Sequence, residues 1–490
     1  MNYRNSIIAL LVFIAIGCND DFLDLAPQDQ ITQANFPESP EDALLATNAM
    51  YQVLRDARYH RGFFPIDDIM SDDALKGSNP GDALATVGPF ETFEFNTSNE
   101  FLQNWWQTLY LGIRRTNVVL DRVPPIDMEE SLKNRYLGEA RFLRALFYSD
   151  LARGYGGVPL ILTGTTDGTI QRASLEDTYT AIESDLRRAI NLLPEKSDYQ
   201  SDDLGRATRG AARALLSRVY LYQQQWDSAV FFAEEVINSG QYSLEPVYEN
   251  AFDENFEHGI ESVFEIGGIG VQGDINAGQN GYTAAQGVRG TPNRGFGFNR
   301  PSLDLINSFE ANDPRLEATV IFLGETLDGI LIEGDPLTAD VDDTGQPETY
   351  NQKVWTPGET VFSNREHNRR IIRYAEVLLN AAEAYAENEN AVQALLYLEQ
   401  VRARAREGNA TILPEITETD PDALLNLIFE ERRHELAMEG FRFWDLVRSG
   451  RAPAVLGPLG FQTDRHELFP IPQLERDITN NNLEQNPGWE

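Results

Sequence analysis

The stretch Arg206–Gln241, RATRGAARALLSRVYLYQQQWDSAVFFAEEVINSGQ, predicts two helices that fold back on each other. Apolar residues recur at helical spacing in its first half, which ends near Tyr222, and again in its second half. The polar break Gln223–Trp226 separates the two halves. Asp227 is suited to cap the second helix and Gly240 to end it. The stretch is therefore a candidate helical hairpin.

The same design recurs in Ile371–Arg406, IIRYAEVLLNAAEAYAENENAVQALLYLEQVRARAR. Tyr385 lies nine residues before Ala394, as Tyr220 lies nine residues before Ala229 in the first stretch. A fixed Tyr-to-Ala spacing across a helix–turn–helix is typical of tetratricopeptide repeats, because the small Ala lets the helices approach closely and the Tyr fills the gap beside it. An ordinary helical hairpin is the alternative. A repeat unit cannot bury its apolar face alone, so the pattern predicts stacked neighbours.

Most of the remaining chain also has helical periodicity, so the expected fold class is mainly α, with four tetratricopeptide-like helix pairs as the scaffold. The run Glu129–Arg153 is apolar on most faces, which predicts a central, buried helix. Ser174 is suited to cap the helix that follows a short strand expected at Val158–Leu162. We expect repeat helices over about 41–55, 101–122, 129–153, 174–193, 206–240 and 369–406.

Between residues 244 and 368 the pattern changes. Glycines cluster there, and short β-like runs such as Ser262–Ile266 alternate with loops. This predicts a loop-rich insertion with short strands, and excursions of this length usually carry function. A C-terminal segment, 421–490, then holds a helix over Asp422–Glu439 that Pro421 opens. We expect its Pro- and Asn-rich tail, Phe469–Trp489, to lie pinned on the surface.

The charge balance limits the classes of partner. The 490 residues carry a formal net charge of −37 and 42% hydrophobic residues, which suffice for a large globular core. Nucleic acid is excluded as a partner, because phosphate binding requires a basic surface field. The balance suits a neutral ligand better than a polyanionic one. Most of the charge is explained by a solvated acidic surface that keeps the protein soluble.

The N-terminus has the features of an export signal. Arg4 precedes the apolar run Ile7–Ile16, which is too short to span a bilayer but has the length of a signal-peptide core. Ala15-Ile16-Gly17-Cys18 follows and resembles a bacterial lipoprotein cleavage site, with Cys18 the only cysteine of the chain. We expect residues 1–17 to form the signal peptide and Cys18 to carry acyl chains that anchor the protein to a membrane. The alternative is a chance cysteine at the end of a cleaved secretory peptide.

Six blocks spread over nearly the whole chain resemble the SusD/RagB family of outer-membrane lipoproteins, which bind nutrients at the surface of Bacteroidota. The blocks occur in the order that the family shows. They are Cys18 with Asp21–Asp24 and Pro27; Trp106–Tyr110 with Ile113 and Asn117; Gly138–Ala145 with Tyr155–Pro159; Arg373–Asn380 with Ala382–Ala384; Glu430–Leu436 with Gly440–Leu446; and Pro470–Pro472 with Asn486–Gly488.

The resemblance implies one SusD-like domain over residues 18–490, in which four helix pairs form a scaffold and loops form the ligand face. It also implies a partner, a SusC-like TonB-dependent transporter in the same membrane, over which the lipoprotein sits as a hinged lid with its repeat side against the barrel. Asp20 and Asp21 resemble the signal that directs such lipoproteins to the outer face of the cell.

Sugar binding requires aromatic faces for stacking and amide or charged groups for hydroxyls. The family draws its glycan platform from the region after the first helix and from the long insertion. Trp355 is the strongest candidate, since a tryptophan in loop sequence between Lys353 and Pro357 has few core duties. The other candidates are Tyr282, Phe296, Arg289, Lys76, Asn79 and Tyr350, with Phe63 and Phe64 nearby in the first region. For each of them, packing or plain exposure is the competing explanation.

Arg289, Arg294 and Arg300 form a small basic island in an acidic protein. Such an island suits an acidic sugar or a peptide carboxylate. The alternative is that these arginines pair with neighbouring acids.

Catalytic and metal signatures are weak. The spacing of Gly268–Gly273 fits a dinucleotide fingerprint, but no helix follows to receive a phosphate. His434-Glu435 begins like a zinc-protease helix, yet Met438 occupies the place of the second histidine. The five histidines show no metal-ligand spacing. We therefore expect no catalytic residue, no cofactor and no metal site, although a glycosidase pair could lie unmarked among 77 acids.

Four hypotheses follow. The first is a surface lipoprotein that captures an oligosaccharide and delivers it to its transporter. The second is the same scaffold with a peptide as ligand. The third is a secreted glycan-degrading enzyme, and the fourth is a repeat scaffold that binds only protein.

Overall fold

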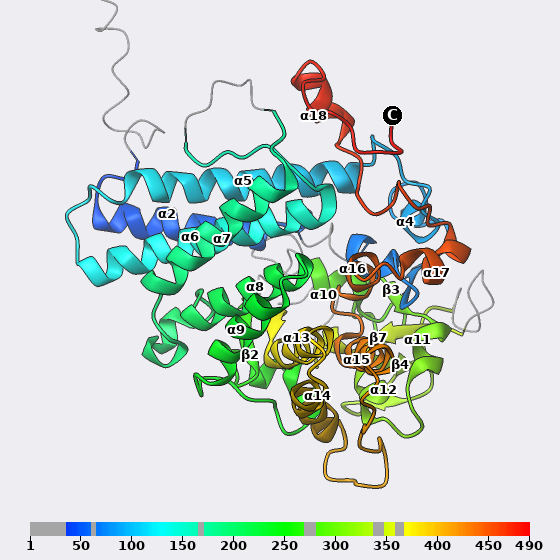
Figure 1. The fold of residues 1–490 in the computed structure, drawn as a ribbon. Coiled ribbons are helices and arrows are strands. Elements are labelled where there is room, and N and C mark those ends of the chain that lie inside the picture. Colours follow the sequence, from blue (N-terminus) through cyan, green and yellow to red (C-terminus); the bar gives the residue numbers. More distant parts are fainter. Residues whose placement is uncertain (1–35, 60–64, 165–170, 269–280, 337–346, 358–366) are drawn as a thin grey trace, which may run out of the picture.

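The computed structural model describes residues 36–59, 65–164, 171–268, 281–336, 347–357 and 367–490. Helices dominate these residues, as the sequence predicts, and eight of them form the expected hairpin scaffold (Figure 1). The pairs are α2 (Pro40–Leu54) with α5 (Glu100–Arg122), α6 (Glu130–Tyr155) with α7 (Leu175–Leu192), α8 (Arg209–Tyr222) with α9 (Trp226–Ile237), and α13 (Tyr374–Glu387) with α14 (Ala391–Ala405).

The pairs stack into one continuous body. Helix α5 packs on α6, α7 packs on α8, and α9 packs on α13, although the whole insertion lies between α9 and α13 in the sequence. The tetratricopeptide-like scaffold is therefore confirmed, and the insertion leaves it at one point and returns to nearly the same point.

The Tyr-to-Ala spacing has the structural role that was predicted. Ala229 and Ala394 are fully buried between the helices of their pairs. Tyr220 donates a hydrogen bond to Glu183 of α7. Tyr385 donates to Glu234 of α9 at 2.6 Å. Each repeat tyrosine thus connects its own helix pair to the pair before it.

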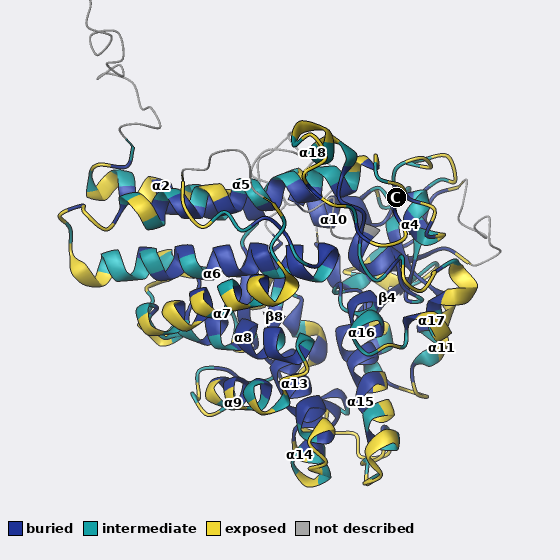
Figure 2. Cartoon of the chain, turned by 45° about the horizontal axis from the view of Figure 1, so that its top comes forward, coloured by how far each residue is buried: buried dark blue, intermediate teal, exposed yellow. Residues whose placement is uncertain are grey.

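Helix α6 lies at the centre of the scaffold and is buried along most of its length, as predicted (Figure 2). It lies close to α5 because Gly112 has no side chain, so a Cβ there would collide with the ring of Phe147. Ser174 caps α7, where its hydroxyl accepts a hydrogen bond from the backbone N–H of Asp177 at 2.9 Å.

Antiparallel pairing of two short strands closes the base of the insertion. Strand β2 (Ser262–Ile266) pairs with β8 (Arg369–Arg373), in a register that places Ser262 opposite Arg373 and Ile266 opposite Arg369. The other strands form two-stranded pairs. They are β1 (Ala74–Gly77) with β3 (Phe298–Pro301), β4 (Val320–Phe322) with β7 (Thr349–Asn351), and β5 (Thr326–Leu327) with β6 (Ile330–Leu331).

Shorter elements cover one end of the stack. The short helices are η2 (Pro65–Ile69), α4 (Gly88–Glu91), α10 (Gly281–Gln286), α11 (Leu303–Ser308), α12 (Pro314–Thr319), α16 (Arg442–Arg448), α17 (Ala452–Leu456) and α18 (Gln473–Ile478). The C-terminal helix α15 (Pro421–Leu436) packs on α13 and α14, so it extends the scaffold towards the insertion. Single turns of 3-10 helix are η3 (Lys196–Asp198), η4 (Ser201–Asp203), η5 (Tyr248–Ala251), η6 (Glu254–Phe256), η7 (Gln352–Val354) and η8 (Gly457–Leu459).

A buried charge cluster joins the insertion to the scaffold. Glu435, on α15, is fully buried and receives three guanidinium groups from three different segments. Arg315 of α12 lies 3.5 Å from its carboxylate, Arg373 of β8 lies at 3.0 Å, and Arg404 of α14 lies at 2.5 Å. Burial alone would raise the pKa of Glu435, but Arg404, Arg373 and Arg315 outweigh it and lower the pKa to about 2.

Three local predictions were wrong. Val158–Leu162 is not a strand, because side chains take the place of a partner strand: the Tyr148 hydroxyl accepts from the Ile161 N–H at 2.7 Å, and Asn117 donates to the Ile161 carbonyl at 2.8 Å. Asp227 is not an N-cap, since α9 begins one residue before it, at Trp226.

The prediction for the C-terminal tail is wrong for its aromatic and apolar residues. Phe469, Ile471 and Trp489 are buried in the main core, whereas residues 473–482 lie at the surface, as predicted. The Trp489 ring stacks on Phe95 with centroids 5.1 Å apart. The tail thus places its aromatic residues in the core, beside the segment that precedes α5.

Cys18 and the apolar run before it lie outside the described residues, so the lipoprotein signal stays a prediction. Within the described ranges, no helix has both the length and the apolar composition that crossing a bilayer demands.

We predict that Ala394→Leu lowers the free energy of unfolding by about 1–3 kcal/mol, because the extra carbons have no room between α13 and α14. Chemical denaturation monitored by circular dichroism measures the change. Val392→Leu is the control, since Val392 is 75% exposed on the same helix and its replacement should change stability by less than about 0.5 kcal/mol. Equal effects of the two variants would contradict the predicted packing.

We predict a larger loss for Glu435→Gln, about 3–5 kcal/mol, because three buried guanidinium groups lose their shared counter-charge. The matched control is Glu430→Gln, on an exposed position of the same helix, with an expected change within about 0.5 kcal/mol. Urea denaturation at neutral pH compares the two variants. A Glu435→Gln protein as stable as the wild type would show that the cluster does not hold the insertion.

Candidate functional site

Three of the predicted ligand residues, Lys76, Asn79 and Arg289, lie at the turn that follows β1. Strand β1 ends at Gly77, whose φ of +68° suits glycine, and a Cβ there would collide with the Gly297 carbonyl just before β3. The loop 78–82 therefore lies directly against the segment 294–298. This contact brings together the two regions, 220 residues apart in sequence, that the family resemblance named for ligand binding.

Lys76 holds the loop 78–82 in place through hydrogen bonds on its buried side. Its side chain is buried, and the ammonium group donates to the backbone carbonyls of Gly77 at 2.8 Å, Asn79 at 3.1 Å and Asp82 at 3.2 Å. Lys76 is therefore committed to loop structure and has no donor left for a ligand. Asn79 is half-buried, but its Oδ1 atom is shielded from solvent and, among the described residues, has no hydrogen-bond partner.

Arg289 spans the same loop from the other side. Its guanidinium donates to Asp82 at 2.6 Å, to Ser78 at 2.9 Å and to Asp335 at 2.6 Å. Arg289, one of the three arginines of the basic island, thus pairs with neighbouring acids, as the alternative explanation predicted. The side chain remains 26% exposed, so one face of this ion-pair cluster is open to solvent.

Trp355 lies at the edge of the insertion, just after β7 and η7. Its indole N–H donates to Asp328 at 2.5 Å, and the guanidinium of Arg294 lies 5.4 Å from its ring centre. Both Trp355 and Phe296 are half-buried, so each presents part of a ring to solvent. A fixed, partly exposed indole flanked by a cation and a carboxylate has the composition of a sugar-stacking position.

Tyr282 and Tyr350 have structural positions. Tyr350 is fully buried, and its hydroxyl donates to the backbone carbonyl of Arg289 at 3.1 Å. Tyr282 is buried against the guanidinium of Arg369, 4.7 Å from the ring centre, and its hydroxyl reaches the Met438 carbonyl at 3.4 Å. Of the predicted set, Trp355, Phe296, Asn79 and Arg289 have surface to offer a ligand. Lys76, Tyr282 and Tyr350 position the loops behind them.

Two neighbouring aspartates attach the start of this face to the C-terminal segment. Asp67 accepts from the indole N–H of Trp444 at 2.7 Å, and Asp68 accepts from the Gly440 N–H at 2.8 Å and from Asn299 at 2.9 Å. Burial raises the pKa of Asp67 to about 7 and that of Asp68 to about 6. Trp444 is in the core, together with Trp105 and Trp106.

No sequence pattern marks the acids that organise this face. Asp82, Asp328 and Asp335 lie in unpatterned loops, and each meets its partner only through long-range folding. Phe63, Phe64 and most of the Gly268–Gly273 motif lie outside the described residues.

A second concave region lies on the scaffold. A cleft of about 590 Å³ separates α5 from α18 and the segment after α6. Trp106 and Tyr110 form its aromatic wall, with ring centres 5.0 Å apart. The Tyr110 hydroxyl donates to the Pro159 carbonyl at 2.9 Å, so this wall is fixed by the main chain opposite.

Comparison with known proteins identifies the family. Residues 21–221 match the family model described as starch-binding associating with outer membrane, and residues 261–459 match the model of the SusD family. Together the two matches cover most of the chain. The chain belongs to the SusD/RagB family.

Full-length relatives agree with this assignment. SusD-like protein P2 of Formosa agariphila is 27% identical, with 99% of both chains aligned. Among solved structures, a laminarin-binding SusD-like protein is 28% identical with a TM-score of 0.77, covering 92% of this chain and all of that one. Surface glycan-binding protein A from Bacteroides thetaiotaomicron, in complex with laminarihexaose, is 25% identical with a TM-score of 0.77, covering 91% of this chain and 99% of that one.

We predict that Lys76→Met lowers the free energy of unfolding by about 1–3 kcal/mol, because three loop carbonyls lose their charged donor. The amides of residues 77–82 should also exchange faster with deuterium. Lys133→Met on α6 is the control, since that lysine has only a 3.7 Å ion pair to an exposed glutamate. Unchanged exchange in the loop would contradict the assigned role of Lys76.

Proposed function

We propose that this SusD-like protein captures an oligosaccharide and passes it to a SusC-like TonB-dependent transporter. Residues 1–17 act as the signal peptide, and acylated Cys18 holds the mature chain, 18–490, on the outer membrane with its ligand face exposed. The ligand is bound without chemical change. The observation that carries the proposal is similarity over more than 90% of the chain to a laminarin-binding SusD-like protein and to a glycan-binding protein solved in complex with laminarihexaose.

The edge of the insertion supports glycan binding. Trp355 offers an aromatic face, and its orientation is fixed by Asp328, which accepts from the indole N–H, and by the Arg294 guanidinium near the ring. Phe296 supplies a second, half-buried aromatic ring, and the partly exposed Asn79 and Arg289 supply polar groups. Sugar rings stack on such faces through C–H groups, while their hydroxyls take amide and charged partners. The ordering of the loops by Lys76, Tyr282 and Tyr350 lowers the entropy lost on binding.

The place where the described chain enters α2 is compatible with a lipid anchor at Cys18. The described chain enters α2 at the end of the helical stack that is remote from β1, β3 and α11 (Figure 1). An anchor that precedes α2 would therefore leave the insertion facing away from the membrane. The description of the matched family model mentions association with the outer membrane, which supports the proposed location.

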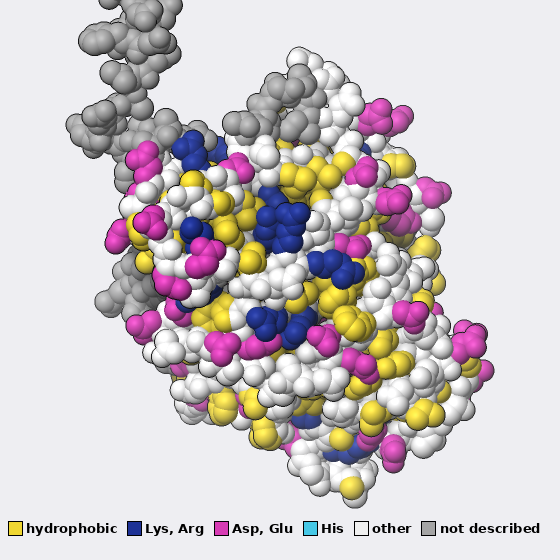
Figure 3. Space-filling model, turned by 60° about the vertical axis from the view of Figure 1, so that its left-hand side comes forward, with side chains coloured by type: hydrophobic (Ala, Val, Ile, Leu, Met, Phe, Trp, Pro, Cys, Tyr) yellow, Lys and Arg dark blue, Asp and Glu magenta, His cyan; other side chains and the backbone are white. Residues whose placement is uncertain are grey.

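The repeat side is the proposed surface for the transporter. Figure 3 looks onto the left-hand side of Figure 1, where Lys and Arg side chains gather in the middle of the face beside hydrophobic ones, and acids lie mainly around them. Mixed apolar and basic surfaces of this kind are typical of protein interfaces, in which arginine is enriched. In a chain with a net charge of −37, such a gathering of cations favours a protein partner over solvent exposure alone.

The peptide-binding alternative uses the same face. Arg289 is the residue that could receive a carboxylate, but Asp82 and Asp335 already neutralise it. This pairing favours a neutral sugar over an anionic ligand. A glycan-degrading enzyme and a purely protein-binding scaffold remain the other two hypotheses to be tested.

We predict that Trp355→Ala weakens binding of laminarihexaose at least tenfold, about 1.4 kcal/mol, because the stacking face is lost. Isothermal titration of the mature protein against laminarihexaose, laminarin and a mixed peptide library measures the affinity. Phe231→Ala is the control, since Phe231 is an exposed aromatic residue on α9, 57% exposed and outside the insertion. Its affinity should equal that of the wild type.

Other results would redirect the proposal. Binding of peptides but not of any glycan would favour the second hypothesis. Release of new reducing ends from laminarin would support an enzyme. Absence of affinity for either ligand class, with the transporter still co-purifying, would support a scaffold that binds only protein.

A further inference from the structure

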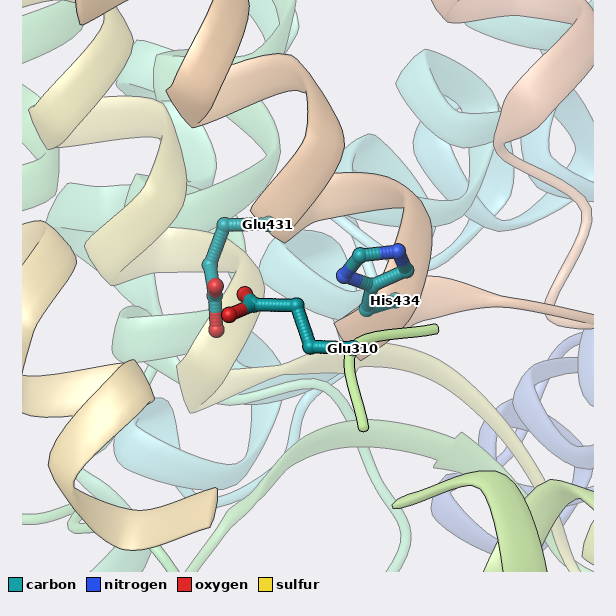
Figure 4. Close-up of side chains that lie close together, drawn as sticks. All are labelled: Glu310, Glu431 and His434. Carbon is teal, nitrogen blue, oxygen red and sulfur yellow. The ribbon is translucent and has the colours of Figure 1, made fainter. Parts of the chain in front are cut away.

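Helix α15 carries a Glu-x-x-His motif, Glu431 and His434, outside the proposed ligand face. Residues three apart on a helix lie on the same side, so the two side chains point in one direction. Glu310, just after α11 in the insertion, approaches them from the opposite side (Figure 4). One ligand-type atom from each of the three side chains lies within 4.8 Å of the other two. Glu-x-x-His pairs on helices supply metal ligands in other helical proteins.

The histidine is prepared for coordination. His434 is 3% exposed, and its Nε2 atom lies 2.9 Å from the Ser308 carbonyl, which can only accept, so Nε2 carries the proton. The Phe309 ring stacks on the imidazole at 4.9 Å and fixes its plane. Nδ1 is then left with a buried lone pair that, among the described residues, has no hydrogen-bond partner. Figure 4 shows this nitrogen turned towards Glu310 and Glu431.

This tautomer is the one that metal sites use. A ligating histidine commonly donates its other ring N–H to a carbonyl or carboxylate, which orients the ring. An unpaired buried nitrogen is costly, so the arrangement requires an explanation. A ligand on Nδ1 would supply one, because the hydrogen bond from Nε2 to the Ser308 carbonyl leaves the Nδ1 lone pair available.

The two carboxylates keep coordination capacity. Arg402 donates to both oxygens of Glu310, at 2.7 and 2.9 Å, and to Glu431 Oε2 at 2.9 Å. Arg315 donates to Glu431 Oε1 at 2.6 Å. Each of the four oxygens accepts one of these hydrogen bonds and has a second lone pair, so an ion would bind beside the Arg402 guanidinium or displace it. The Glu310 side chain is 40% exposed, so it can rotate to tighten around an ion.

An ion could reach the three side chains. They line an open cavity of about 470 Å³, which also contacts the loop 414–418 and the exposed Glu430. The acids of this rim would attract a cation towards the buried histidine.

We propose that Glu310, Glu431 and His434 bind a divalent first-row transition-metal ion, of which Zn²⁺ is the best fit, with water at the remaining position. A nitrogen and two carboxylate oxygens suit Zn²⁺, which takes such ligands at about 2.0–2.2 Å. Ca²⁺ and Mg²⁺ prefer all-oxygen sites. The ion would connect the insertion, through Glu310, to α15 of the scaffold, so its role is structural and it is independent of glycan binding.

The experiment uses chelator-treated mature protein and ZnCl₂ alone as the probe. Isothermal titration should show one Zn²⁺ per chain, and saturating Zn²⁺ should raise Tm. Glu310→Gln should weaken Zn²⁺ binding at least tenfold without loss of the fold, because Glu310 is exposed. Glu430→Gln is the control, since Glu430 lines the same cavity but is not among the proposed ligands. It should bind Zn²⁺ as the wild type does.

A spectroscopic readout tests the histidine directly. Zn²⁺ should shift the Nδ1 resonance of His434 in a ¹⁵N spectrum, and His434→Gln, checked for folding by circular dichroism, should abolish tight binding. Equal weakening by Glu310→Gln and Glu430→Gln would show that Zn²⁺ binds a diffuse acidic surface, and the proposal would be wrong. It would also fail if Zn²⁺ left the His434 resonance and Tm unchanged. Laminarihexaose affinity serves as the separate readout of the proposed function, and these variants should not alter it.

Discussion

The structure depends on one buried charge cluster centred on Glu435 of α15. Its carboxylate receives Arg315 from the insertion, Arg373 from β8 and Arg404 from α14. A buried ion pair contributes little net stability against an apolar substitute, but removal of one partner strands the other charges. The cluster is therefore a device of specificity more than of stability. It fixes how an irregular insertion of over a hundred residues sits on a regular helical stack.

The helical stack is continuous although the insertion interrupts it in the sequence. Strands β2 and β8 close its base, and α9 packs on α13 as if nothing lay between them. Repeats contact mainly their neighbours, so an excursion between two pairs leaves the stack intact. The loops beyond β2 are then free to present side chains for recognition. The division of labour between scaffold and loops is a property of the fold and is independent of any particular ligand.

The candidate ligand face shows how loops become rigid without a core of their own. Lys76 closes one loop through three carbonyls, and Arg289 joins that loop to Asp335 across the face. Buried polar groups that are fully paired order a surface at small net energy. The surroundings of His434 are different, because Nδ1 of its ring has no hydrogen-bond partner among the described residues. Side chains whose polar atoms are all hydrogen-bonded, such as Lys76, therefore support the loops, whereas a side chain with an unpaired buried atom, such as His434, is a candidate for binding.

The sequence alone determined the helical scaffold, because the periodicity of helices such as α8 and α13 and the Tyr-to-Ala spacing are local properties of the chain. It also identified the insertion and the segments that resemble the family. It could not distinguish Tyr350 and Lys76 from Trp355, since all three are polar or aromatic residues in loop-like sequence, and burial depends on distant partners such as the Arg289 carbonyl. The local pattern predicted a strand at Val158–Leu162, because nothing in it shows that the side chains of Tyr148 and Asn117 hydrogen-bond to this backbone. Only the tertiary structure brought Glu310 to Glu431 and His434, because contacts over 120 residues leave no periodic trace in a sequence.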